Sequence, residues 1–388
     1  MNWFDKNPAK AKLILLLTLA AAFMLLLIIA ELTFGYFTYK HKYSEAVNSG
    51  KRYIRLRENP PNTDITEEIT ADAKKRNEIV NLPQKSYRLK TDDDGFIFPG
   101  KIYKKPDITL FFLGGSTTEC RAVSEDKRFP YLAGRLLEKA GGLKVNSYNG
   151  GVSGNHSMHS INILINKVLP HHPDIVVLMH NANDILLIPY GSYWNNKPGK
   201  SLVMKPNENE KKEDSKNLLN LPVLREWAVK SLHSFVWSPA PDNYTKYLKN
   251  DGEKIVIDKK QVLMQFESSL KTFSGVCKAW NIKPVLMTQP IFEANSKTYS
   301  GEFPDKFEFT MPVVPLKDSV MLYVLYSFHE LFNGIIRKVA EEENILLIDL
   351  KKQVPAQDHK FIYDLYHYND EGSELIAKII SGQLLQYM

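Results

Sequence analysis

Short apolar runs alternate with amphipathic stretches along the last two thirds of the chain. Residues 108–113 (ITLFFL) form a continuous apolar run that ends at two glycines, which is typical of a buried parallel strand. Similar runs occur at 144–149, 174–179, 283–288 and 345–349. Stretches with helical spacing separate or follow these runs, at 129–140, 157–169, 260–280, 317–342 and 371–386. Strands that alternate with helices predict βαβ units and an α/β fold with a mainly parallel sheet.

The N-terminal pattern is different, because residues 13–30 are uncharged and apolar on every side of a helix. This length is enough for a helix to cross the hydrocarbon core of a membrane. A cleaved signal peptide usually has a shorter apolar region with small residues at the cleavage site, and no Ala-x-Ala pattern follows here. The sequence therefore predicts an uncleaved transmembrane anchor at 13–37, preceded by a short cytoplasmic N-terminus at 1–12.

Charged and aromatic residues beside this segment indicate its orientation. The positive-inside rule favours a cytoplasmic N-terminus, since more lysines precede the segment than follow it: Lys6, Lys10 and Lys12 against Lys40 and Lys42. Aromatic residues on the far side suit an interfacial belt: Phe34, Tyr36, Phe37 and Tyr39. We therefore expect a single-pass protein whose remaining residues lie on the extracytoplasmic side, periplasmic or external.

The rest of the chain divides by composition. Residues 43–106 are polar with few apolar runs, and they predict a lead-in segment that packs on the main domain. Residues 107–388 carry the alternating pattern of the main domain, which an insertion at 190–255 interrupts. Within the insertion, residues 195–217 are rich in lysine, asparagine and glutamate and predict a mobile surface excursion. An aromatic patch follows in the same insertion: Trp227, Phe235, Trp237, Tyr244 and Tyr247.

Composition excludes several classes of protein. With 44% apolar and 24% charged residues over 388 positions, the chain is neither disordered throughout, nor collagen-like, nor a coiled-coil rod. The net charge of +6 is spread along the chain without a zinc-finger pattern or a continuous basic stripe, so we expect no nucleic-acid partner. Two cysteines are too few for a disulfide scaffold or a four-thiolate zinc site, and a disulfide between Cys120 and Cys277 stays open.

Candidate chemistry begins directly after the first strand, at residues 114–118 (GGSTT). Glycines allow a tight turn that leaves the Ser116 hydroxyl exposed, and a backbone N–H at a helix start can face a developing anion. The alternative is an ordinary serine cap at the start of a helix. A phosphate-binding loop is disfavoured because the Gly-x4-Gly-Lys-Ser/Thr pattern is absent.

Two further polar clusters follow strands, at residues 149–155 and 180–184. Gly154 can offer its N–H, and Asn183 its side-chain amide, to the same oxyanion. The alternative for both clusters is a turn in which polar side chains bond their own backbone. His180 fits either a residue that lines the site or a satisfied structural histidine.

The fourth cluster precedes the final helix and contains Asp364 and His367. Two intervening residues let a turn place the aspartate beside the imidazole, where it fixes the tautomer and stabilises the charged ring. A lone Asp-x-x-His is also compatible with a plain surface turn.

The order of the four clusters resembles the SGNH/GDSL hydrolase family over residues 107–189 and 256–388. The blocks 114–118, 149–154, 181–184 and 364–372 are similar to its nucleophile, glycine, Gly-x-Asn-Asp and Asp-x-x-His blocks. Residues 87–96 also resemble a segment that precedes the nucleophile in membrane-anchored members. Two positions depart from the family pattern: Gly115 replaces the aspartate of Gly-Asp-Ser, and Asn181 replaces the glycine of Gly-x-Asn-Asp. The second departure predicts a narrower acyl pocket or an altered turn around Asn183.

The resemblance implies a three-layer αβα fold and a serine hydrolase mechanism. Ser116 is the implied nucleophile, His367 the general base and Asp364 the residue that orients it. The implied oxyanion donors are the backbone N–H groups of Ser116 and Gly154 and the amide of Asn183. The mechanism needs no cofactor and no metal, and it predicts that Asn183→Ala impairs turnover far more than folding.

Together these features predict a membrane-anchored serine esterase that removes acyl groups, acetyl above all, from an envelope polysaccharide or related glycan. Alternatives on the same fold are an O-acyltransferase to a sugar, a lipid esterase or thioesterase, and a non-catalytic glycan-binding or assembly protein. The expected partners are the acylated substrate, the membrane and the envelope polysaccharide assembly.

Overall fold

The computed structural model describes residues 2–48, 54–71, 74, 79–83, 86–188, 205–206, 254–293, 302–310 and 319–388. It divides into two units, one of Met1–Arg55 with Lys205–Lys246 and one of Leu56–Met204 with Tyr247–Met388. The predicted insertion at 190–255, including its aromatic patch, lies outside the described residues apart from 205–206 and 254–255.

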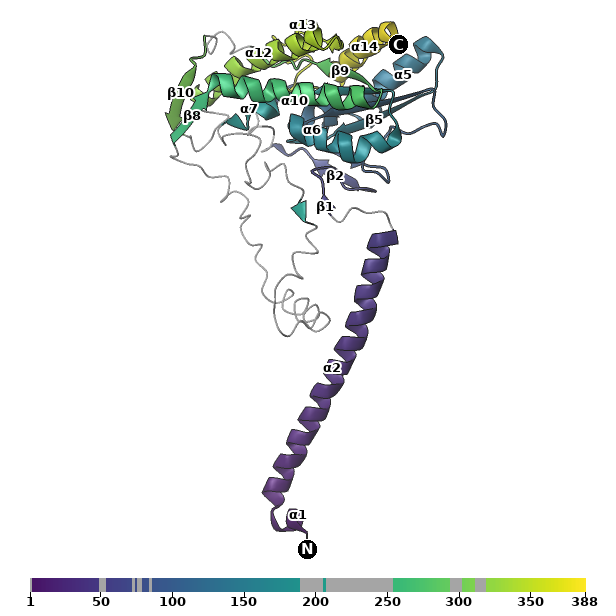
Figure 1. Ribbon diagram of the computed structural model, residues 1–388, viewed down its shortest axis with the longest axis vertical. Coiled ribbons are helices and arrows are strands. Elements are labelled where there is room, and N and C mark those ends of the chain that lie inside the picture. Colours follow the sequence, from purple (N-terminus) through teal and green to yellow (C-terminus); the bar gives the residue numbers. More distant parts are fainter. Residues whose placement is uncertain are drawn as a thin grey trace. The chain divides into compact units, whose positions relative to one another are not determined.

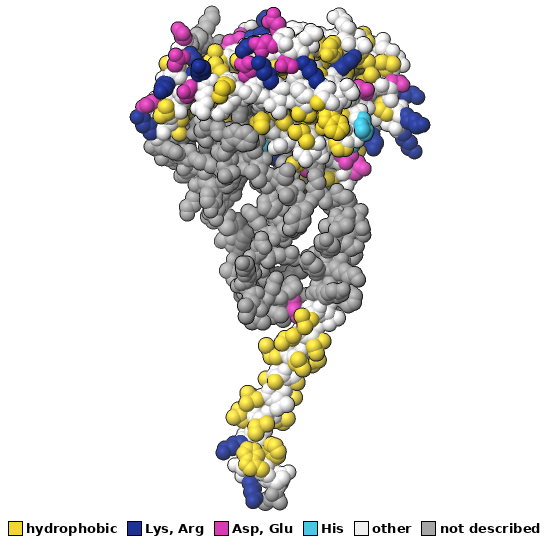
Figure 2. Space-filling model, viewed as in Figure 1, with side chains coloured by type: hydrophobic (Ala, Val, Ile, Leu, Met, Phe, Trp, Pro, Cys, Tyr) yellow, Lys and Arg dark blue, Asp and Glu magenta, His cyan; other side chains and the backbone are white. Residues whose placement is uncertain are grey.

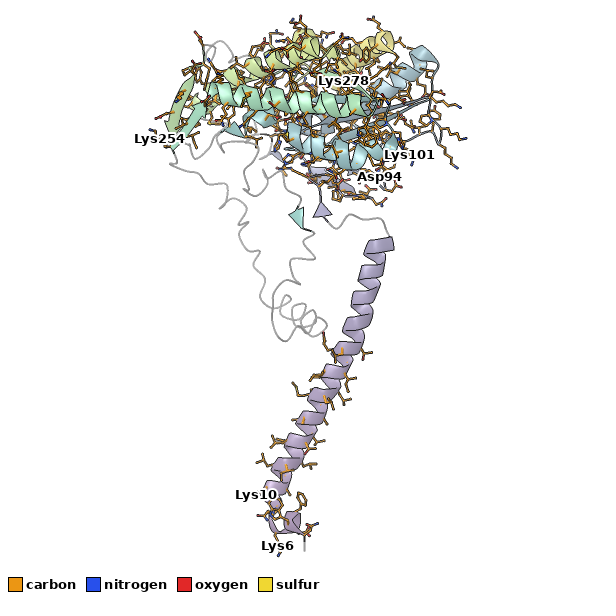
Figure 3. The ribbon with its side chains drawn as sticks, in the orientation of Figure 1. Lys6, Lys10, Asp94, Lys101, Lys254 and Lys278 are labelled. Atoms are coloured by element: carbon orange, nitrogen blue, oxygen red, sulfur yellow. The ribbon has the colours of Figure 1, made fainter. Side chains whose placement is uncertain are left out.

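The first unit contains the long N-terminal helix. A short helix, α1 (Trp3–Lys6), precedes α2 (Pro8–Asn48), and a strand pair joins β1 (Ile54–Arg55) to β7 (Lys205–Pro206). Within the described residues α2 holds the one helix segment, Pro8–Thr33, that is long and apolar enough to cross a membrane. Its apolar side chains are exposed all round, and Lys6 and Lys10 lie at its N-terminal end (Figures 2 and 3). The side chains of the predicted aromatic belt at 34–39 lie outside the described residues.

The second unit is built on a five-stranded parallel sheet (Figure 1). Its strands are β4 (Ile108–Gly114), β5 (Val145–Gly151), β6 (Ile175–Met179), β9 (Lys283–Met287) and β11 (Leu346–Ile348). They lie in the order β11-β9-β6-β4-β5 with every neighbouring pair parallel. The predicted α/β fold with a parallel sheet is therefore confirmed.

Helices cover both faces of this sheet, because alternate residues of each buried strand face opposite cores. Phe111 and Leu113 of β4 pack with α6 (Ser157–Ile163), α10 (Lys259–Ala279) and α12 (Ser319–Glu342). Leu110 and Phe112 pack on the other side with α5 (Phe129–Gly141) and α14 (Asp370–Tyr387). The result is the three-layer αβα arrangement that the family resemblance implies.

Shorter elements complete the second unit. The lead-in contributes the antiparallel hairpin of β2 (Asp64–Glu68) and β3 (Ser86–Lys90), and a second antiparallel pair joins β8 (Lys254–Asp258) to β10 (Lys306–Thr310). The remaining short helices are α4 (Ser116–Glu119), η1 (Glu125–Lys127), η2 (Leu164–Val168), η3 (Leu169–His171), α7 (Ala182–Ile185) and α13 (Leu350–Gln353). The lead-in shares the core of this unit, since Phe96 and Ile97 are both 1% exposed and Ile97 bridges to Asn149 of β5.

The two cysteines are free and buried. Cys120 belongs to the core beside α5 and α14, whereas Cys277 belongs to the core beside α10 and α12. The sheet separates the two thiols, so the disulfide that the sequence left open does not form in this fold.

Candidate active site

The four polar clusters of the sequence meet at one edge of the sheet. Three of them lie at the carboxyl ends of β4, β5 and β6, and the fourth directly precedes α14. In an open parallel sheet, ligands bind in the crevice beyond the carboxyl ends of the strands, where the chain direction switches sides. Here β4 lies between the edge strand β5 and the central strand β6, so the loops after these three neighbouring strands border that crevice.

The nucleophile candidate Ser116 begins α4, and Gly115 is its N-cap. A Cβ atom at Gly114 would lie 2.1 Å from Oγ1 of Thr118, and one at Gly115 would lie 2.2 Å from Nδ2 of Asn183. A larger residue at 114 would clash with the backbone of β6 as well, whereas one at 115 would require the Asn183 side chain to shift. The Gly115 departure from the Gly-Asp-Ser pattern thus lets the Asn183 amide lie against the nucleophile turn.

The side chains of Ser116, His367 and Asp364 form one hydrogen-bonded relay. Oγ of Ser116 lies 2.7 Å from Nε2 of His367, and Nδ1 of His367 lies 2.7 Å from Oδ2 of Asp364. The other carboxylate oxygen of Asp364 accepts the backbone N–H groups of Tyr366 (2.9 Å) and His367 (2.8 Å). This loop geometry fixes the carboxylate, which in turn fixes the imidazole with Nε2 directed at Ser116.

Electrostatics within the relay favour a charged imidazole next to a charged carboxylate. Burial by itself lowers the pKa of His367, but the charge and hydrogen bond of Asp364, with the charge of Glu119, outweigh burial and raise it. Burial raises the pKa of Asp364, and the charge and hydrogen bonds of His367 outweigh it and hold that pKa below its usual value. Each partner thus stabilises the ionised form of the other. During acyl transfer His367 becomes an imidazolium, and the Asp364 carboxylate stabilises that charge.

The oxyanion candidates lie on loops that are bonded to one another and to the turn before Ser116. Gly154 has φ of +75°, a left-handed conformation that favours glycine, and it lies in the turn after β5. Nδ2 of Asn183 donates to the carbonyl of Asn155 at 2.8 Å, which joins the third block to the second. The N–H of Val152 donates to the carbonyl of Gly114 at 3.1 Å, which joins the second block to the first. The predicted donors on Ser116, Gly154 and Asn183 therefore belong to one connected group of loops.

Replacing Asn183 with alanine will lower kcat by roughly 10²- to 10³-fold, the usual effect of losing one oxyanion donor. KM for a small ester will change little, because the bond from Asn183 to the oxyanion forms only in the transition state. Steady-state kinetics beside a thermal melt will test this. Loss of activity in proportion to loss of folded protein would assign Asn183 a structural role instead.

The departure at Asn181 places a side chain in the core beside α12. Its Nδ2 donates to the carbonyl of His329 at 2.9 Å and to Oδ1 of Asn333 at 3.0 Å, and the residue is fully buried. The neighbouring backbone N–H of Ala182 donates to Oε1 of Gln289 at 3.0 Å. These bonds hold the start of α7, and hence the loop that carries Asn183.

His180 both lines the site and has a structural role. Its Nε2 lies 2.7 Å from Oγ of Ser160, and the residue is 3% exposed. Burial, with a smaller contribution from His159, lowers its pKa to about 3. A neutral ring at this position leaves His367 as the histidine suited to proton transfer with Ser116.

Glu119 is a site residue that the sequence analysis did not identify. It lies on α4 three residues after Ser116, its carboxylate is buried, and it contacts Oγ of Ser153 beside Gly154. Burial raises the pKa of Glu119, and its charge contributes to the raised pKa of His367. Residues 116 and 119 lie three positions apart, which places them on one side of a helix. This spacing was the feature of the sequence that could have identified Glu119.

Exchanging Glu119 for glutamine will move the acid limb of the kcat/KM profile to lower pH. His367 must be neutral to accept a proton, so activity rises with pH through its pKa. The negative charge of Glu119 stabilises the imidazolium of His367, so its removal lowers the pKa of His367. The acid limb of the profile then moves to lower pH by the same amount. Measuring kcat/KM against pH, with the exposed Glu371→Gln as control, will test this. An unmoved acid limb would show that Glu119 does not act on His367.

A small pocket adjoins Ser116. It has a volume of about 10 Å³, and it is lined by Gly115, Ser116, Thr117, Met179, His180, Asn181, Ala182, Asn183, Gln289 and Tyr366. A cavity of this size holds roughly one water-sized group. Asn181 lines this pocket, but its amide is bonded to α12, so the narrowing of the acyl pocket by this side chain stays a prediction.

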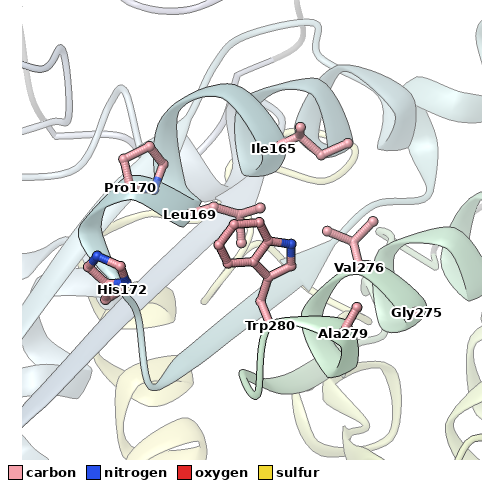
Figure 4. A pocket seen from close by; sticks show the side chains of 8 residues that line it. All are labelled: Ile165, Leu169, Pro170, His172, Gly275, Val276, Ala279 and Trp280. Atoms are coloured by element: carbon pink, nitrogen blue, oxygen red, sulfur yellow. The ribbon is translucent and has the colours of Figure 1, made fainter.

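A larger apolar pocket lies elsewhere on the same unit (Figure 4). It has a volume of about 490 Å³, and η2, η3 and the end of α10 supply its lining, with Trp280 57% exposed. Its lining residues on η3 and α10 precede β6 and β9, so it lies toward the amino ends of these strands. The candidate active site is at the opposite, carboxyl ends.

The central parallel sheet, the αβα layers and the four blocks in order at one sheet edge decide the fold type. This arrangement resembles that of SGNH/GDSL hydrolases. Among the described residues, no group of three or more histidine, cysteine, aspartate or glutamate side chains is placed to hold a metal ion.

Solved structures with a similar fold include esterases and lipases. An acetylxylan esterase from Geobacillus stearothermophilus is 16% identical, with 72% of this chain and 94% of that one covered and a TM-score of 0.40. A putative GDSL-like lipase from Parabacteroides merdae is 15% identical, with 73% of this chain and 99% of that one covered and a TM-score of 0.40. A lipase/acylhydrolase from Enterococcus faecalis is 17% identical, covers 72% and 96%, and has a TM-score of 0.39.

No protein-family model matches the sequence, and no curated protein matches it. At these identities and TM-scores the solved structures show a likeness and assign no function to this chain. The candidate site therefore rests on the distances within this chain.

Proposed function

We propose that this chain is a membrane-anchored serine esterase that acts through an acyl-enzyme and removes acetyl groups from an envelope polysaccharide or related glycan. The observation that carries ester cleavage is the relay of two 2.7 Å contacts from Ser116 through His367 to Asp364. A relay of this geometry, which joins Ser116 to a loop 251 positions away in the sequence, supports catalysis over a purely structural role.

The chemistry follows from the positions of these groups. His367 accepts the hydroxyl proton as Oγ of Ser116 attacks the ester carbonyl carbon. The N–H groups of Ser116 and Gly154 and the amide of Asn183 stabilise the resulting oxyanion. The intermediate collapses to an acyl-serine while the leaving alcohol takes the proton from His367. Water then attacks the acyl-serine while His367 accepts its proton. The bond to Oγ of Ser116 breaks, His367 returns the proton to Oγ, and the acid leaves.

The small pocket beside Ser116 supports a short acyl group. Its volume of about 10 Å³ holds roughly one water-sized group, which leaves little room for a long acyl chain. A long acyl chain would need an apolar channel from this point. We therefore expect acetyl esters to react much faster than octanoyl esters of the same alcohol, and equal rates would contradict the proposed acyl preference.

The apolar helix segment Pro8–Thr33 supports attachment to a membrane. Lysines before it support a cytoplasmic N-terminus, and a catalytic unit outside the cytoplasm would meet envelope glycans and their assembly partners. Alkaline phosphatase fused to the C-terminus should then be active in intact cells. An inactive phosphatase fusion with an active cytoplasmic reporter would reverse this orientation.

The decisive experiment treats the detergent-solubilised full chain with a fluorophosphonate probe and then with acetylated oligosaccharides. Labelling at Ser116 and release of free acetate are the expected results. Acetate found on an added acceptor sugar would instead indicate an O-acyltransferase, since a sugar hydroxyl can replace water in the second step. Folded protein that is neither labelled nor active would support a non-catalytic glycan-binding protein.

A further inference from the structure

We propose that the lead-in residues Leu56–Asn59 form part of the active site and that Arg57 positions the oxyanion loop, defined as residues 153–155. This inference deepens the proposed esterase function and rests on it. Arg57 and the oxyanion loop are distant in the sequence, since 96 positions separate Arg57 from Ser153.

Arg57 is bonded to the oxyanion loop on both sides of Gly154. Its Nη2 donates to the carbonyl of Ser153 at 3.2 Å. Its own carbonyl accepts Nδ2 of Asn155 at 3.0 Å. The residue therefore bridges the two neighbours of Gly154, whose N–H is the proposed oxyanion donor.

The guanidinium also occupies the space beside Gly154 itself. A Cβ atom at Gly154 would lie 2.6 Å from Nη2 of Arg57. Together with the φ of +75°, this close approach gives Gly154 two separate reasons to be glycine. Arg57 therefore packs directly on the backbone whose orientation determines the direction of the Gly154 N–H.

The residues around Arg57 fix its own position. Glu58 pairs with Lys167 at 3.1 Å, and the two side chains are only 8% and 5% exposed. Nδ2 of Asn59 donates to the carbonyl of Gly151 at the end of β5, at 3.1 Å. Leu56 is buried. A buried ion pair that loses one partner is strongly destabilised, so this segment has little freedom to move away from the loop.

The opposite side of the oxyanion loop is held by Glu119, which contacts Oγ of Ser153. Arg57 and Glu119 thus hold Ser153 through its carbonyl and its hydroxyl. A displacement of about 1 Å in a catalytic group can lower a rate roughly 10²-fold. We therefore expect removal of the Arg57 side chain to lower kcat by about that factor while KM for a small ester stays nearly constant.

The test compares Arg57→Ala, Arg57→Lys and Arg88→Ala in the detergent-solubilised full chain. Arg88 is the matched control, because it is an arginine of the same lead-in whose side chain is 46% exposed and pairs with Asp64 at the surface. Hydrolysis of p-nitrophenyl acetate gives kcat and KM, thermal melting reports folding, and amide hydrogen exchange reports the order of the oxyanion loop.

In Arg57→Ala, kcat should fall and hydrogen exchange should rise in peptides that contain residues 153–155, but not in peptides of β6. Arg57→Lys should recover part of kcat, and Arg88→Ala should match the wild type. A raised KM with unchanged kcat would overturn the proposal, because Arg57 would then bind substrate and not position the loop. Unchanged kcat together with unchanged loop exchange would overturn it as well.

Failure of the esterase function can be recognised separately. If Ser116 of the wild type is not labelled by the fluorophosphonate, the proposed reaction is wrong. Hydrogen exchange alone then tests whether Arg57 holds the oxyanion loop in place. Faster exchange of the oxyanion loop in Arg57→Ala would still support the positioning contact, and unchanged exchange would overturn it.

Discussion

Replacing Ser116 with alanine will abolish fluorophosphonate labelling and lower ester hydrolysis on the order of 10⁶-fold, as loss of the nucleophile does in other serine hydrolases. This factor corresponds to about 8 kcal/mol of transition-state stabilisation. No other group in the relay carries a hydroxyl that can attack the carbonyl, because His367 and Asp364 only transfer and stabilise charge. The expected result is therefore loss of kcat without loss of folded protein.

Ser116→Ala should fold normally, because the hydroxyl hydrogen-bonds His367 at a partly exposed position. Ser381→Ala is the matched control. Ser381 lies on α14, and its hydroxyl donates to the carbonyl of Lys378 in the same helix. Intact-mass and peptide analysis of the labelled protein will locate the adduct. If the Ser116→Ala variant were still labelled, at Ser153, then Ser116 would not be the nucleophile.

Exchanging Asp364 for asparagine will lower kcat by roughly 10⁴-fold, the size of effect seen when a triad aspartate is made neutral. One oxygen of the asparagine can still accept the backbone N–H groups of Tyr366 and His367, so the loop should keep its shape. The new NH₂ group would face Nδ1 of His367. It would force the proton onto Nε2, which could then no longer accept the proton of Ser116.

The same substitution has a defined effect on pH dependence. The charge and hydrogen bond of Asp364 raise the pKa of His367, so a neutral residue 364 lowers that pKa. The residual activity of Asp364→Asn should therefore reach its plateau at a lower pH than the wild type. Asp358→Asn is the control, because Asp358 is exposed and bonds the backbone N–H of Lys360 in a comparable turn. Wild-type kcat in Asp364→Asn would exclude the proposed triad.

The local pattern of the sequence predicted most of the regular structure of the second unit. The apolar run at 108–113 became β4, and the helical stretch at 317–342 became α12, each within two residues. The helix expected at 157–169 is instead divided into α6, η2 and η3, with a wider π-helical turn in the middle. Periodicity does not register such a turn, because the apolar spacing on either side of it is still helical.

The pair of β8 and β10 was not predicted. β8 has an alternating pattern of only five residues, and its partner lies some fifty positions away. A strand of this kind gains its stability from the other strand, so its own residues carry little signal.

The site was predicted only as far as its residues follow strand ends and fixed spacings. Ser116 follows an apolar run and two glycines, and Asp364 and His367 are separated by two residues, so the sequence made them candidates and the family resemblance implied their roles. The 2.7 Å contact between Ser116 and His367 depends on how β4 and the loop before α14 meet, 251 positions apart. Glu119 and Arg57 carried no comparable motif.

The sequence by itself determined the apolar N-terminal helix, the succession of buried strands and amphipathic helices, and the identity of the triad candidates. Those features are local, since burial and periodicity act over one or a few turns of chain. Tertiary structure decided that Asn183 lies against Gly115, that Asn181 is bonded into α12, and that Arg57 packs on Gly154. Such contacts arise only when distant segments pack together, because their strength depends on distance and burial and not on spacing along the chain.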